Sequence, residues 1–200
     1  KDERKFSELS LEEVKQLRYG EEKQGRVATF GEILNLIKFS NSKANALHLK
    51  GIFQDKEKID LLISELQKYE EVLDKILIFD VKPEWAKYLK EKVPQLKLAP
   101  SVAHKYDIER YNSAVKGTLI SLEESVDFGE IYDWVWLDEW DLSDEDGRKK
   151  KFYTKENFNL LREIGYKIAL VTPELHGTSP GLLGGEAHAD AENKEKLFSR

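Results

Sequence analysis

The sequence predicts an α/β fold and, within that class, an incomplete (β/α)8 TIM barrel. Five short apolar segments alternate with amphipathic segments, which is the pattern of parallel strands joined by helices. The strand segments follow one another at intervals of about 31 residues, close to one-eighth of a barrel of about 250 residues. At that spacing the chain holds about five strands, so we expect the first two strands and the last one to be missing.

One domain is expected to span residues 1–200, because 200 residues with 40% hydrophobic content can bury one core. The sequence begins with Lys and contains no Met, so we expect it to be a piece of a longer protein. A doubly wound open sheet is the alternative fold. Such a sheet would normally carry a Gly-x-Gly-x-x-Gly turn, and the sequence has none.

The charge and the amino-acid composition argue against several classes of protein, nucleic-acid-binding proteins first. Charged residues make up 35% and the formal net charge is -6, which is unusual for a nucleic-acid-binding protein. The basic cluster at 148–151 directly follows an acidic segment, so a solvated loop is favoured over a phosphate-binding patch. The absence of Cys excludes disulfides and thiolate metal sites. No apolar stretch approaches the roughly 20 residues of a membrane span, and we expect a cytoplasmic protein of unknown oligomeric state.

Capping boxes mark where the first helices begin. The segments 10–13 and 29–32 both match the Ser/Thr-x-x-Glu pattern ahead of apolar residues at helical spacing. A polar loop is expected between these two helices. The segment 44–53 alternates polar and apolar residues as a strand does, and the segment 55–72 carries the single apolar face of a helix.

The same alternation continues through the second half of the chain. Pro is favoured in the first turn of a helix, Ser and Thr supply N-caps, and Gly ends a helix. We therefore expect strands at 76–81, 96–102, 133–140 and 168–171, and helices that begin near Pro83, at Ser121, at Thr154 and, unfinished, at Asp190.

Glu174 and His176 form the strongest candidate pair, at the C-terminal tip of the last buried strand. In parallel α/β folds the carboxyl ends of the strands surround one crevice, where ligands bind. A carboxylate beside an imidazole can bind a metal or transfer protons, so both residues are candidate catalytic groups. Hydrogen bonds that only hold the loop are the alternative. The glycine-rich segment 177–185 gives a weak signal for an anion-binding turn.

Three further candidates lie near the ends of earlier strands. His48 and Lys50 lie on one strand face, opposite Leu47 and Leu49, and Asp80 ends the next strand. Polar groups that face a barrel interior are costly without partners. We therefore interpret His48 and Lys50 as candidates for a metal or phosphate role, and Asp80 as a candidate ligand of a divalent cation. An internal ion pair is the alternative, in which Asp80 would hold Lys50.

Asp138 and Trp140 share one face of the fourth strand. An acid beside a large aromatic ring suits a hydrophobic floor for a substrate, so we mark both as candidate substrate-binding residues. Large aromatic side chains are more often part of the core, and that is the alternative interpretation of this segment.

Three segments of the chain resemble the glycerophosphodiester phosphodiesterase family of TIM barrels, within the phosphoinositide-phospholipase-C-like superfamily. The first comprises 5–17 and 26–34, and is similar to a family segment that ends in an arginine-led Pro-Thr-Leu-Glu-Glu pattern, with Ala28 in place of the proline. The second is 46–50 and the third is 166–177.

This resemblance implies roles for individual residues. The segment 46–50 corresponds to a family strand with a Glu-x-Lys pattern, in which the Glu binds a divalent cation and the Lys lies near the phosphate. Lys50 matches that Lys, whereas His48 replaces the Glu and removes a negative charge from the metal site. The Pro-Glu-Leu-His-Gly sequence at 173–177 replaces the usual aromatic-Thr end of the seventh strand, which indicates a divergent subfamily.

The function that the resemblance implies is metal-dependent hydrolysis of a small-molecule phosphodiester in glycerophosphodiester or lipid metabolism, with Mg²⁺ or Ca²⁺ as cofactor. The family's two acid/base histidines and its other metal ligands would precede Lys1, so we expect this chain alone to be inactive. Metal-dependent turnover of a glycerophosphodiester by these residues alone would refute that. The alternatives are a non-catalytic barrel that binds a phosphorylated or sugar-like ligand, and a scaffold whose unpaired sheet edges self-associate.

Overall fold

The computed structural model describes residues 5, 8–19, 25–105, 108–109, 118–138 and 152–170. The helices among them are α1 (Leu11–Gln16), α2 (Phe30–Phe39), α3 (Lys56–Leu66), α4 (Pro83–Lys92), α6 (Leu122–Asp127) and α7 (Lys155–Glu163), with 3-10 segments η2 (Gly51–Phe53) and η3 (Gln67–Lys75). The strands are β1 (Arg18–Tyr19), β2 (Gly25–Arg26), β3 (Asn45–His48), β4 (Ile76–Phe79), β5 (Lys97–Ala99), β6 (Ser101–Ala103), β7 (Trp134–Asp138) and β8 (Lys167–Leu170).

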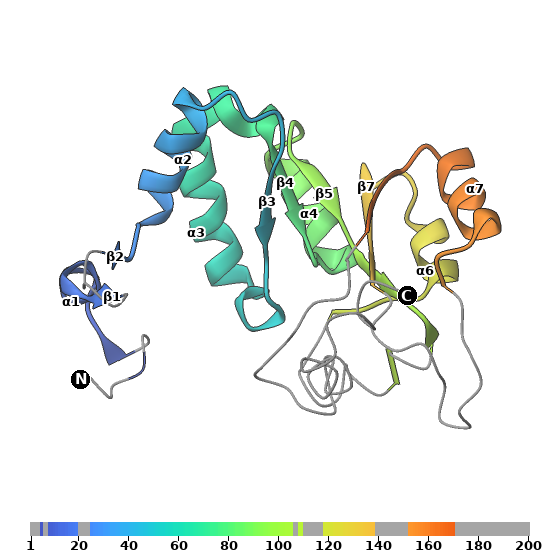
Figure 1. The fold of residues 1–200 in the computed structure, drawn as a ribbon, viewed down its shortest axis with the longest axis horizontal. Coiled ribbons are helices and arrows are strands. Elements are labelled where there is room, and N and C mark those ends of the chain that lie inside the picture. The colour runs from blue at the N-terminus through green and yellow to red at the C-terminus, as the bar shows by residue number, and fades with distance from the viewer. Residues whose placement is uncertain are drawn as a thin grey trace, which may run out of the picture.

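The architecture is α/β, and the prediction of an incomplete TIM barrel is wrong. The parallel strands form two three-stranded sheets, β3-β4-β5 and β6-β7-β8, and no barrel closure is found within the described ranges. A barrel requires every strand to have two partners, whereas β3 and β8 each pair with one described strand. Figure 1 shows α2 and α3 beside the first sheet, and α6 and α7 beside the second.

The division between the sheets falls at Pro100, inside the segment predicted as one strand at 96–102. β5 pairs with β4 on one side of this residue, and β6 pairs with β7 on the other. Proline has no N–H to donate to a strand ladder, so regular pairing is interrupted there. The Pro100 carbonyl still accepts a hydrogen bond of 3.0 Å from the Trp136 N–H. The sheets divide at this residue, but they also meet before it, because the Asp133 N–H donates a hydrogen bond of 3.1 Å to the Leu98 carbonyl of β5.

One hydrophobic core joins the two sheets. A single cluster of buried side chains contains Ile78 and Leu98 from the first sheet and Val135 and Leu137 from the second. Leu98, Val135 and Leu137 are completely buried. The helix-facing residues of the strands are apolar, as alternation along a strand predicts.

Several predicted elements are shorter than expected. The helix at 55–72 ends as α3 at Leu66 and continues as the 3-10 segment η3, in which Tyr69 has non-helical angles (φ -134°, ψ 45°). The strand at 44–53 pairs only over β3 and then turns into η2. The capping boxes of α1, α2 and α6 are confirmed, as are Pro83 in the first turn of α4 and Thr154 as the N-cap of α7.

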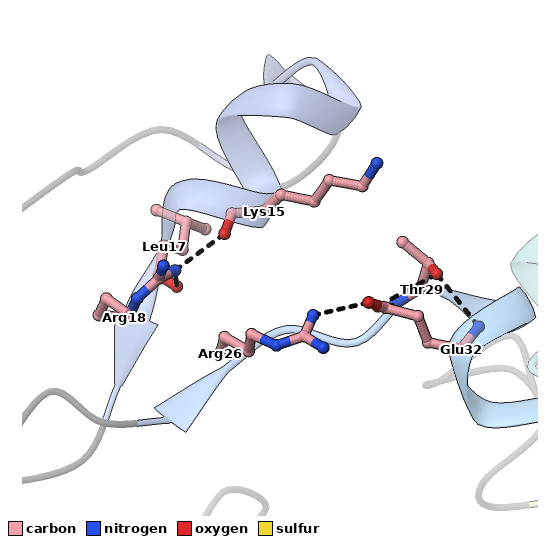
Figure 2. Close-up of polar contacts among 6 residues, drawn as sticks. All are labelled: Lys15, Leu17, Arg18, Arg26, Thr29 and Glu32. Carbon is pink, nitrogen blue, oxygen red and sulfur yellow. Dashed lines mark hydrogen bonds and ion pairs between the residues drawn. The ribbon is translucent and has the colours of Figure 1, made fainter. Parts of the chain in front are cut away.

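The N-terminal segment contains an antiparallel ribbon, β1–β2, where a polar loop was predicted. Figure 2 shows how its two arginines connect the helices: Arg18 donates hydrogen bonds of 2.8 and 3.0 Å to the carbonyls of Lys15 and Leu17 at the end of α1. Arg26 binds Glu32 of the α2 capping box at 2.9 Å. The bond from the Thr29 backbone and the contact with Arg26 hold the pKa of Glu32 below its usual value.

None of the helices in the described ranges is long and apolar enough to cross a membrane.

Candidate functional site at the ends of β3 and β4

The site begins with the backbone of Asp80, the residue that follows β4. Its φ angle is 67°, the left-handed conformation, and it is the one non-glycine residue with positive φ in the described part of the chain. For an L-residue this conformation costs about 1–2 kcal/mol, and Asp is among the residues that tolerate it best. Strained backbone of this kind persists where surrounding contacts hold it, and it is common in functional sites.

The imidazole of His48 lies against the Asp80 carboxylate. The distance from His48 Nε2 to Asp80 Oδ2 is 3.0 Å, and the two side chains are 46% and 14% exposed. β3 and β4 run parallel with His48 opposite Phe79, so the last residue of one strand meets the first residue after the other. The structure thus brings together the two residues that the sequence predicted as metal ligands, in what we call the His48–Asp80 pair.

Two side chains that the sequence did not single out hold Asp80. The Thr118 hydroxyl donates a hydrogen bond to Oδ1, the oxygen that does not face His48. The Gln54 amide donates a bond of 2.6 Å to the Asp80 carbonyl. Thr118 and Gln54 are both buried. Neither carries a sequence signal, because each is a single polar residue that reaches Asp80 only through the fold.

An aromatic row extends from the His48–Asp80 pair across the sheets. The His48 ring stacks on Phe79 with centroids 4.7 Å apart, and Phe79 stacks on Trp136 with centroids 3.9 Å apart. These three rings come from β3, β4 and β7, on the strand face opposite Leu47 and Ile78, which pack in the core. Stacking fixes the plane of the imidazole. It leaves Nε2 in contact with Asp80.

The loop that contains Asp80 is also held from the second sheet. The Tyr132 hydroxyl, just before β7, donates a hydrogen bond of 2.6 Å to the Val81 carbonyl. Burial raises the pKa of the Tyr132 hydroxyl far above its usual value. This group therefore stays protonated and continues to donate at physiological pH.

His48 Nε2 and Asp80 Oδ2 are the two atoms of the pair that would hold a divalent cation, with Nε2 deprotonated and the cation in place of the direct hydrogen bond. Adjacent ligands of an octahedral cation at about 2.1 Å lie about 3.0 Å apart, the separation found here, although a direct hydrogen bond has the same length. No group of three or more His, Cys, Asp or Glu side chains that could hold a metal gathers anywhere in the described residues, around this pair included. Two protein ligands suit a hard cation that keeps several waters and also binds substrate phosphate.

Lys50 is exposed and lies two residues after His48, at the start of η2. The alternative interpretation, in which Asp80 holds Lys50, is not what the structure shows, because the carboxylate of Asp80 contacts His48 and Thr118. The expectation that Lys50 faces a barrel interior is wrong as well, because no barrel forms.

The other predicted site residues are not placed with the pair. Asp138 ends β7 in register with Ala103 and is 6% exposed, so it belongs to the second sheet. Trp140, Glu174 and His176 lie outside the described residues, as do the glycine-rich segment 177–185, the basic cluster 148–151 and the helix predicted from Asp190.

An open cavity of about 670 Å³ lies at the C-terminal end of β6. His104, Lys105, Glu109, Glu123 and Glu124 are among the residues that line it. We assigned no role to His104 from the sequence. The cavity is lined by residues of both charge signs, and it lies between the segment that follows β6 and the start of α6.

Comparison with known proteins gives no matching family model and no matching curated protein. The resemblance to glycerophosphodiester phosphodiesterases therefore stays a prediction that rests on the residues themselves.

Proposed function

We propose that this chain carries part of the metal and phosphate site of a phosphodiester hydrolase, of the glycerophosphodiester phosphodiesterase type. The single observation that supports this proposal is the His48–Asp80 pair, which joins an imidazole and a carboxylate at 3.0 Å beyond the ends of two parallel strands. Such strand ends are the usual place of ligand sites in α/β folds.

His48 and Asp80 would hold a divalent cation, which when bound supplies Lewis-acid polarisation of a phosphate oxygen. Mg²⁺, Ca²⁺ or Mn²⁺ suits the carboxylate, whereas the imidazole also suits a softer cation such as Zn²⁺. Lys50 is exposed two residues from His48, where its ammonium group would neutralise charge on the phosphate. Asp80 is oriented for this role by the hydrogen bond from Thr118. Glu174 and His176 remain predicted catalytic residues.

A second candidate is a module that binds a phosphorylated or sugar-like ligand without catalysis. The aromatic row of His48, Phe79 and Trp136 favours it, because sugars and other ligands with apolar faces pack against aromatic rings. This candidate does not require a metal at Asp80. The two proposals therefore predict different results for Asp80→Asn. The substitution should abolish metal binding under the first proposal and leave ligand binding intact under the second.

Thermal unfolding with Mn²⁺ tests the first proposal. At a free metal concentration of 100 times Kd, binding stabilises the native state by about 2.7 kcal/mol, which raises Tm by roughly 5–10 °C for a chain of this size. We expect this shift in the wild type and its loss in His48→Ala and Asp80→Asn. Asp127→Asn, which removes an exposed carboxylate at the end of α6, should keep it.

Titration with glycerophosphocholine in the presence of Mn²⁺ extends the test to the phosphate. We expect Lys50→Gln to weaken phosphodiester binding and to leave Mn²⁺ binding unchanged, because Lys50 contributes charge to the phosphate and no ligand to the metal. Unchanged Tm with millimolar Mn²⁺ and Mg²⁺, or a shift that persists in Asp80→Asn, would exclude the proposed hydrolase site. Metal-independent ligand binding by Asp80→Asn would support the second candidate.

A further inference from the structure

We propose that Gln54 and Thr118 are positioning residues for the His48–Asp80 pair, and that together they determine which carboxylate oxygen faces the imidazole. The carboxylate of Asp80 has two oxygens, and the structure divides them between two partners. Thr118 donates to Oδ1, and His48 contacts Oδ2 at 3.0 Å. With Oδ1 bound, rotation of the carboxylate about its last bond would break a buried hydrogen bond.

Gln54 holds the backbone under this carboxylate. Its Nε2 donates hydrogen bonds of 2.7 Å to the Leu49 carbonyl and 2.6 Å to the Asp80 carbonyl, and its Oε1 accepts one of 2.9 Å from the Lys82 N–H. Leu49 follows His48 in the chain, and Lys82 follows Asp80 by two residues. One buried amide therefore connects the loop after β3 to the loop after β4 and sets the distance between them.

The orientation of the Gln54 amide follows from its partners. Two of them are carbonyl oxygens, which only accept, and the third is an N–H, which only donates. A flipped amide would place oxygen against both carbonyls and NH₂ against the N–H. Because every contact would then be repulsive, the assignment is unambiguous.

These contacts also account for the left-handed backbone of Asp80. Its carbonyl is bound by Gln54, its carboxylate by Thr118, and the next carbonyl, that of Val81, by Tyr132. Backbone strain persists at a functional residue when surrounding contacts determine it from several sides. Partners that orient metal ligands in this way typically change metal affinity by 10–100-fold when they are removed.

Removing the side chain of a positioning residue has a different effect from removing that of a purely structural residue. If Gln54 and Thr118 only stabilise the fold, removing either lowers the free energy of unfolding and leaves the His48–Asp80 contact intact in the folded molecules. If they position Asp80, the contact itself changes. The tautomer of His48 reports this without any metal, because the bond to Asp80 Oδ2 favours a proton on Nε2.

The test uses the whole 200-residue chain in two substitutions that keep side-chain size. Thr118→Val removes the hydroxyl and Gln54→Met removes the amide, while Thr118→Ser restores a hydroxyl. Tyr166→Phe is the matched control, because it removes a buried hydrogen bond of 2.6 Å to the Ser125 carbonyl, in which neither His48 nor Asp80 takes part. The readouts are the ¹⁵N chemical shifts of the His48 ring, Kd for Mn²⁺, and unfolding by urea.

We expect His48 of the wild type to carry its proton on Nε2, and Thr118→Val and Gln54→Met to show both tautomers and Kd values for Mn²⁺ about tenfold higher. Thr118→Ser should stay within about twofold of the wild-type Kd, and Tyr166→Phe should lose stability with both site readouts unchanged. Folded Thr118→Val or Gln54→Met with wild-type tautomer and Kd would overturn the inference. If one of these variants fails to fold, the other decides.

Only the metal readout of this inference rests on the proposed function. If the wild type binds no Mn²⁺, the proposed hydrolase site is excluded, and the tautomer of His48 in the two variants still decides whether Gln54 and Thr118 position Asp80.

Discussion

Each of the two parallel sheets has an aspartate at the end of its central strand, but the residue that the neighbouring strand places beside it differs. Asp80 follows β4, and the neighbouring strand β3 supplies His48 beside it. Asp138 ends β7, and the neighbouring strand β6 supplies Ala103 in register with it. The first sheet therefore brings an imidazole to 3.0 Å from its strand-end acid, whereas the residue in register with the acid of the second sheet is an alanine.

The sheets also differ in how their strand ends are held. The loop after β4 is fixed by Gln54, by Thr118 and, from the side of the second sheet, by Tyr132. The second sheet thus contributes to the site of the first without supplying a ligand to the pair. Both sheets pack side chains into one buried cluster, so we expect them to unfold together.

The largest expected effect comes from truncating the shared core. Leu98 of the first sheet and Leu137 of the second are both completely buried in the same cluster. Leu98→Ala and Leu137→Ala should each lower the free energy of unfolding by about 2–5 kcal/mol, through lost burial and a residual cavity. In both variants urea unfolding, followed by tryptophan fluorescence and by circular dichroism, should remain one coincident transition.

Leu61→Ala is the control for these substitutions. This α3 side chain is 61% exposed, so its truncation should change stability by no more than about 0.5 kcal/mol. If Leu137→Ala instead unfolds in two steps, with the first sheet unaffected, the sheets are separate units and the comparison between them does not hold.

An intermediate effect is expected from alkaline pH. Burial raises the pKa of Tyr166 to about 12, whereas a tyrosine of the unfolded chain ionises near 10. The unfolded state therefore loses its proton first. The stabilising contribution of this group is complete below about pH 10 and is lost as the pH rises toward 12. Burial raises the pKa of Tyr132 in the same direction.

The measurement is urea unfolding between pH 9 and pH 11.5, with tyrosinate absorbance as a second readout. The free energy of unfolding of the wild type should fall as the pH rises. That of Tyr166→Phe should fall less steeply, because the variant lacks one of the ionising groups. At pH 7 that variant should lose about 1 kcal/mol for the missing bond to Ser125. Equal pH slopes for the two proteins would show that Tyr166 is not buried as described.

The smallest effect is expected at the helix caps. Thr29→Ala and Ser121→Ala remove N-cap hydroxyls from α2, which packs by the first sheet, and from α6, which packs by the second. Each should cost about 1 kcal/mol of stability. Ser10→Ala removes the same bond from α1, which has no buried residue, and should change global stability by less than about 0.3 kcal/mol. A loss at Ser10 as large as at Thr29 would mean that α1 is coupled to the core.

Local features were predictable from the sequence because their signals act within a few residues. Ser10, Thr29 and Ser121 begin helices as predicted, since a capping box needs only its own four residues. The alternation of Leu47 and His48 correctly put the two side chains on opposite faces of β3, but His48, which was expected to face a barrel interior, is exposed. The strand periodicity, however, led to a TIM barrel that the pairing excludes.

What the tertiary structure decided lies between residues far apart in the chain. His48 and Asp80 are 32 positions apart, and Thr118 reaches Asp80 across 38, so their contacts depend on strand register and on the path of the loops. The sequence by itself determined where the capped helices begin and that β3, β4, β7 and β8 are strands. Only the fold decided that the strands divide at Pro100 and that a left-handed Asp80 meets an imidazole, because these outcomes depend on pairing energies summed over distant segments.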